Sequence, residues 1–192
     1  MRPTTRRRSG DTGFTLIEVL VALVVLSLTA SGIAVLFVMS IRDSRAARDQ
    51  TTAMVMAVER MEQLWALTWG IDAATGVPLS DVTTELGRSP PDGSGNGLVP
   101  SPPGSLETNT PGYVDYLDGR GRWMGTGATP PAGATYIRRW HIEPLPADPD
   151  TLVLRVLVTT VVRDASPLAA GQRRTRRADE ALLVTVKTRK AG

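Results

Sequence analysis

The sequence predicts an α+β fold in which one long N-terminal helix packs on a small three-stranded antiparallel sheet. Three features of the 192 residues lead to this prediction. An apolar run near the N-terminus continues into an amphipathic segment, the middle of the chain is rich in glycine and proline, and three segments typical of strands follow. A helix whose apolar stripe covers one face of an antiparallel sheet belongs to the α+β class.

Residues 14–41 are predicted to be the membrane-spanning half of the helix. No charged side chain occurs from Val19 to Ile41, and these 23 residues span about 35 Å as a helix, enough to cross a hydrocarbon core of about 30 Å. Backbone groups in lipid must hydrogen-bond within their own segment, which favours a helix despite the many valines. Arginines at positions 6–8 precede the run, so we expect the N-terminus in the cytoplasm and the residues after 41 outside.

Residues 42–69 are predicted to continue the same helix as an amphipathic half. No proline occurs between Pro3 and Pro78, and Gly70 is a natural helix stop. We therefore expect one helix from residue 14 to residue 69, with an apolar stripe that packs on the sheet. The stripe has spacings of three and four residues, with Leu64 beside it, and comprises Ala47, Thr51, Met54, Val58, Met61, Trp65 and Thr68.

Residues 70–134 are predicted to be a loop region between helix and sheet. They contain thirteen glycines and nine prolines, a composition that argues against a long helix or a central strand. Residues 90–97 and 100–104 are expected to be exposed loop. Asp115 and Asp118 flank a turn signal, and we interpret them as turn residues because too few oxygen ligands accompany them for a calcium loop.

Residues 135–192 are predicted to form the sheet. The segments 135–143, 152–162 and 181–188 combine β-branched and aromatic residues with alternation, and their connections favour an antiparallel meander. His141 lies inside the first of these strands. No nucleophile motif accompanies it, so we interpret this single histidine as structural.

Composition narrows the possible functions further. The chain has no cysteine, which rules out disulfides, thiolate nucleophiles and cysteine-ligated metal centres. The net charge of +3 arises within residues 1–13, where four arginines accompany one aspartate, and the rest of the chain is formally neutral. No phosphate loop, G-x-S-x-G motif or paired-carboxylate arrangement is present. We therefore expect a non-enzymatic protein with no cofactor and no metal.

One charge run in the C-terminal part leaves two interpretations open. Arg173, Arg174, Arg176 and Arg177 lie in the loop between the last two predicted strands. Arginines bind phosphates, so a nucleic-acid contact is one interpretation. The run contains no aromatic residue to stack on bases, which favours the other interpretation, a solvated loop tip.

Glu18 is the one charge in the apolar run and marks a candidate functional position. A carboxylate in a membrane segment costs about 2.5–3.5 kcal/mol at the helix centre and less near an end, so its presence calls for a partner. The run Gly13-Phe14-Thr15-Leu16-Ile17-Glu18, after an arginine-rich leader, resembles the class III signal of type IV prepilins and type II secretion pseudopilins. A conventional secretory signal has a shorter apolar core, which disfavours that alternative.

The resemblance implies a processing and assembly route. Residues 1–13 would be a leader that a membrane prepilin peptidase removes between Gly13 and Phe14, and the same enzyme would N-methylate Phe14. Glu18 would then neutralise the new amine, usually that of a neighbouring subunit, while the helix packs against other pilins. The precursor would be a single-pass inner-membrane protein, and the mature chain would join a pilus or pseudopilus in the periplasm or at the cell surface.

Three features favour a minor subunit within this family, and one of them is the absence of a cysteine pair. Many major pilins carry a proline about twenty residues into the helix, whereas residues 31–35 here contain none, and Gly32 is the one soft point. Residues 136–140 at the start of the sheet resemble minor pilins of the PilV-like kind. The alternatives are a DNA-binding minor pilin for DNA uptake and a membrane-anchored periplasmic domain that is not assembled. The shared leader does not distinguish a pilus from a type II secretion system.

Overall fold

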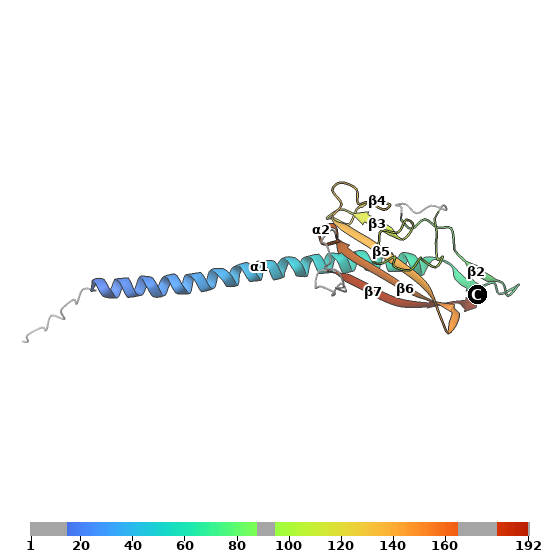
Figure 1. Ribbon diagram of the computed structural model, residues 1–192. Coiled ribbons are helices and arrows are strands. Elements are labelled where there is room, and N and C mark those ends of the chain that lie inside the picture. Colours follow the sequence, from blue (N-terminus) through green and yellow to red (C-terminus); the bar gives the residue numbers. More distant parts are fainter. Residues whose placement is uncertain (1–14, 88–94, 165–179, 192) are drawn as a thin grey trace, which may run out of the picture. The chain divides into compact units, whose positions relative to one another are not determined.

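The computed structural model describes residues 15–87, 95–164 and 180–191 (Figure 1). The chain divides into two compact units, Met1–Ser44 and Arg45–Gly192. Helix α1, Leu16–Ala66, begins in the first unit and ends in the second. Every described residue of the first unit is exposed, and this apolar stretch is the one candidate membrane span in the described part of the chain, by length and composition. The helix continues through Gly32 without a break.

The long helix is confirmed, but its C-terminal end is three residues earlier than predicted. It ends at Ala66 because Trp69 and Gly70 belong to strand β1, Trp69–Ile71, rather than to a helix stop. Strand β1 pairs antiparallel with β2, Pro78–Ser80, and parallel with β8, Lys190–Ala191. These three short strands form a small sheet in the order β2-β1-β8.

The main sheet has five strands, so the prediction of three strands was wrong. Its order is β4-β3-β5-β6-β7, and every neighbouring pair is antiparallel. The predicted strands correspond to β5, Tyr136–Leu145, β6, Asp148–Thr160, and β7, Ala181–Thr188. The predicted second strand ends at Thr160 because a short helix, α2, occupies Val161–Asp164.

The two additional strands come from the region predicted to be loop. Strand β3, Val114–Leu117, lies between β4, Trp123–Thr126, and β5, so the expectation that this region holds no central strand was wrong. Regional composition was misleading because residues 113–118 contain no glycine or proline and are long enough for a four-residue strand. The turn interpretation is confirmed for Asp118, whose Oδ1 accepts hydrogen bonds from the N–H groups of Arg120 and Arg122.

The core of the second unit lies between the C-terminal part of α1 and one face of the main sheet. On the sheet side it contains Trp140, Ile142 and Leu154, which are fully buried. The buried residues of α1 are Ala53, Met56, Ala57, Arg60, Met61 and Leu64. Figure 1 shows α1 running along the strands β5, β6 and β7 within this unit.

The helix contacts the sheet through a different face from the one predicted. Of the predicted stripe, Met61 and its neighbour Leu64 are buried, but Met54, Val58 and Trp65 are 39%, 39% and 42% exposed. The face that packs on the sheet is displaced by about one residue, or about 100° around the helix. It contains the small residues Ala53 and Ala57, which bring the helix backbone close to the strands.

Candidate functional site

The N-terminal end of α1 is built around Thr15 and Glu18. The Thr15 hydroxyl accepts a hydrogen bond from the Glu18 N–H at 3.3 Å, and the Thr15 carbonyl accepts from the N–H groups of Glu18 and Val19 at 3.1 and 3.2 Å. Thr15 therefore caps the helix, and Glu18 occupies the third helical position. A carboxylate in this first turn is favoured by the partial positive charge of the helix N-terminus.

The surroundings of Glu18 are otherwise apolar. The helix face beside it is exposed and almost entirely apolar, and it comprises Ile17, Glu18, Val21, Ala22, Val25, Leu26 and Thr29. Among the described residues, no arginine, lysine or histidine lies within ion-pair distance of Glu18. An exposed carboxylate at the head of an apolar helix is thus positioned to receive a cation from a separate group.

The other residues predicted for the site lie outside the described part of the chain. This applies to Gly13 and Phe14 at the predicted cleavage point and to the arginines at 173, 174, 176 and 177.

A comparison with protein families decides the identity of the N-terminal segment. The family model for the prokaryotic N-terminal methylation motif matches residues 8–34, which include the predicted cleavage point, Glu18 and most of the apolar run. The N-terminal segment is that of a type IV prepilin-like protein. No curated protein and no solved structure matches it. The motif indicates processing by prepilin peptidase, and with the long apolar helix it fits a membrane-anchored precursor.

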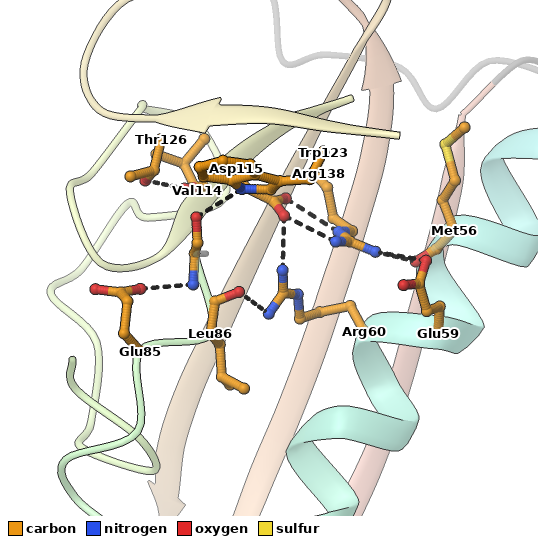
Figure 2. A network of polar contacts seen from close by, with 11 residues as sticks. Met56, Glu59, Arg60, Glu85, Leu86, Val114, Asp115, Trp123, Thr126 and Arg138 are labelled. Carbon is orange, nitrogen blue, oxygen red and sulfur yellow. Dashed lines mark hydrogen bonds and ion pairs between the residues drawn. The ribbon is translucent and has the colours of Figure 1, made fainter. Parts of the chain in front are cut away.

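The second unit of this prepilin-like protein contains a buried ion network that the sequence did not reveal (Figure 2). Arg60 of α1 donates to Asp115 Oδ2 of β3 at 2.6 Å and to the Leu86 carbonyl. Arg138 of β5 binds the same carboxylate through Nε and Nη2 at 3.0 and 2.8 Å. The side chains of Arg60, Asp115 and Arg138 are at most 3% exposed.

The same network reaches the helix backbone. Arg138 Nη1 donates to the Met56 carbonyl at 3.0 Å and to Glu59 Oε2 at 3.2 Å. The guanidinium of Arg60 also lies 4.4 Å from the centre of the Trp140 ring, a cation–π contact. Burial lowers the pKa of Arg60 to about 10, although the Asp115 carboxylate acts in the opposite direction. Burial also opposes the charge of Arg138, but the carboxylates of Asp115 and Glu59 together outweigh it and raise the Arg138 pKa.

A third buried cation, Lys187, holds the end of α1. Lys187 of β7 donates to the carbonyls of Leu64, Trp65 and Leu67 at 3.2, 2.6 and 2.6 Å. The last carbonyls of a helix have no partner within it, so this ammonium replaces a conventional C-cap. Burial lowers the pKa of Lys187, with a smaller contribution from the nearby charge of Lys190.

His141 connects a loop to strand β5. Its Nδ1 lies 2.8 Å from both the Ser101 and the Ser105 hydroxyl, and its Nε2 lies 3.2 Å from Glu143 Oε2. Ser105 is completely buried, so its hydroxyl is closed to a substrate. These contacts fix the loop at residues 101–105 against the sheet and agree with a structural role for His141.

The sequence offered faint signals for the ion network. Arg60 interrupts an apolar stripe at a core spacing, and Arg138 occurs in a strand of aromatic and aliphatic residues. A charged residue at a core position is rarely buried without a partner, so each of these positions signals a buried counter-ion. The partner Asp115 was instead assigned to a turn, because it lies three residues before the glycine-containing turn at Asp118.

Proposed function

We propose that this prepilin-like protein is a non-enzymatic structural subunit, a minor pilin or minor pseudopilin of a type IV pilus or type II secretion pseudopilus. The methylation motif at residues 8–34, with Glu18 as the one charge on an exposed apolar helix face, is the observation that carries the proposal. Cleavage after Gly13 creates a positive amine on Phe14, four residues before Glu18 and about 6 Å away along the helix axis. A subunit displaced along the axis therefore presents its amine to the Glu18 carboxylate.

The energetics favour this pairing. Opposite charges about 4 Å apart at an effective dielectric constant near 20 attract by about 4 kcal/mol before desolvation is subtracted. Because an unpaired charge in lipid is unfavourable, the pair fixes the axial register of two helices as well as stabilising their contact.

The second half of α1 supports assembly through the same helix. Met54, Val58 and Trp65 form an exposed apolar stripe on the side of the helix that the sheet does not cover. Apolar side chains repeated along one helix face are the surface that a second helix packs against. The proposed partners are accordingly prepilin peptidase, other pilins and the inner membrane.

The test compares processing with incorporation in a host that has the assembly machinery. Glu18→Ala is expected to lose its leader normally and to remain in the membrane without entering filaments. Glu62→Ala, an exposed carboxylate on the same helix, is the matched control and is expected to be incorporated. Normal incorporation of Glu18→Ala would refute the role of Glu18.

A second variant tests the cleavage position. Replacing Gly13 with leucine is expected to leave the leader attached, because the peptidase of this family cuts after glycine. An N-terminal Phe14 on that variant, found by mass spectrometry, would contradict the assignment. An intact Met1 on the unaltered chain would favour the alternative, a membrane-anchored domain that is not assembled.

A further inference from the structure

The C-terminal part of α1 carries two apolar stripes with the same spacing. The inner stripe contains Ala53, Ala57 and Leu64, which are buried together with Met56 and Met61, and the outer stripe contains Met54, Val58 and Trp65. Each outer residue directly follows an inner residue, so the stripes are related by a rotation of about 100°.

Apolar burial alone does not choose between the two settings of the helix. A shift by one position replaces Ala53, Ala57 and Leu64 by the larger Met54, Val58 and Trp65. The same shift replaces the buried Met56 by Ala57 and the buried Met61 by the charged Glu62, which lowers the apolar area removed from water. The setting of the helix therefore also depends on interactions that change with rotation.

The buried ion network supplies an interaction that depends on rotation. Arg60 lies on the inner face, and its guanidinium reaches both Asp115 and the Leu86 carbonyl (Figure 2). A rotation of about 100° would move that guanidinium away from both acceptors and put Met61 in its place. It would also displace Glu59, which contacts Arg138. Breaking a buried charge pair is strongly unfavourable because it leaves an uncompensated charge.

The cap at the end of the helix acts mainly on the backbone. Lys187 binds the carbonyls of Leu64, Trp65 and Leu67, groups that point along the helix axis at the end of α1. Its ammonium also lies 5.5 Å from the centre of the Trp65 ring, so this one contact with the outer stripe adds to the effect of the ion network.

We propose that the Arg60–Asp115–Arg138 network is a rotational selector, which fixes the face of α1 that meets the sheet and keeps Met54, Val58 and Trp65 on the outside. Its value lies in specificity rather than in net stability, because charged clusters replaced by apolar residues of similar size often retain their stability. That the outer stripe is kept for another subunit rests on the proposed function. The selector itself operates in a single chain, so its test is independent of assembly.

The absence of native cysteine makes the helix setting directly measurable. Single-cysteine variants Ala57→Cys and Val58→Cys of the full chain in detergent micelles are labelled with a maleimide. Ala57 is completely buried and Val58 is 39% exposed, so these adjacent positions report opposite faces. With the network intact, position 58 is expected to react at least about tenfold faster than position 57, since labelling of a buried site waits for local opening.

Removal of the network tests the selector. In the background Arg60→Met, Asp115→Leu, Arg138→Met, the chain is expected to unfold cooperatively, and the two positions are expected to react at similar rates. An unchanged preference for position 58 would overturn the proposal and assign the selection to the close fit of Ala53 and Ala57. Loss of cooperative unfolding would also overturn it, because the network would then be required for stability.

Moving the cation provides a second test. The pair of changes Arg60→Leu and Met61→Arg carries the guanidinium about 100° around the helix while keeping the charge. The proposal expects the labelling order to reverse, with position 57 faster than position 58. Retention of the original order would contradict a selector based on Arg60.

Discussion

Replacing Asp115 with leucine should destabilise the second unit more than any surface charge substitution. The change removes the acceptor of three hydrogen bonds, one from Arg60 at 2.6 Å and two from Arg138 at 2.8 and 3.0 Å. Both guanidiniums are nearly completely buried, so they lose their common counter-ion without gaining water. Breaking a buried ion pair from one side costs about 3–5 kcal/mol, and we expect a loss in this range.

Urea unfolding of the full chain in micelles, followed by tryptophan fluorescence, measures this loss. With a slope of about 2 kcal/mol per molar urea, the expected loss moves the midpoint down by about 2 M. Asp150→Leu is the matched control, because Asp150 pairs with Arg189 but its side chain is 61% exposed. An exposed pair contributes at most about 1 kcal/mol. A loss below about 1 kcal/mol for Asp115→Leu would refute the reasoning that the two arginines depend on this carboxylate.

Three further predictions concern the cap and the turns. Lys187→Met leaves the helix-end carbonyls without their donor and should cost about 1–3 kcal/mol in urea unfolding. Burial lowers the Lys187 pKa, so just below pH 10.5 the unfolded chain binds more protons than the folded chain. The free energy of unfolding of the unaltered protein should therefore rise with pH in this range more steeply than that of Lys187→Met. Equal slopes of unfolding free energy against pH for the two proteins would contradict this prediction. The N–H groups of Arg122 and Arg120 lower the Asp118 pKa, so Asp118 stabilises the fold above pH 3.8 and loses this contribution as the pH falls below it. Asp118→Asn should lack this acid-dependent loss of stability. Identical profiles of unfolding free energy against pH for the variant and the unaltered protein would count against the prediction. Gly121→Ala should cost more than Gly76→Ala, because both glycines have positive φ but an added Cβ at Gly121 lies 3.3 Å from Met56 Cε; equal thermal shifts would argue against that contact.

The membrane half of the helix and its motif were predictable because their signals are local. An uncharged run of 23 residues from Val19 to Ile41 and the sequence around Glu18 need no tertiary contact to be recognised. Strands β5, β6 and β7 were also predictable, since their alternation and β-branched residues extend over eight or more residues.

The face of α1 that meets the sheet was not predictable from apolar spacing. Residues 53, 57 and 64 and their successors 54, 58 and 65 have the same spacing, and the second set has the larger apolar side chains. The choice between them involves Arg60 and a carboxylate 55 positions away, a contact that periodicity does not contain. Strand β3 was missed for a related reason: four residues give too short a pattern, and pairing with β4 and β5 stabilises it.

The N-terminus of the mature chain provides the most direct test of the whole account. Mass spectrometry of the protein isolated from its native host should find an N-terminal peptide that begins with N-methylated Phe14. An unprocessed chain that still begins at Met1 in cells with an active prepilin peptidase would contradict the assignment.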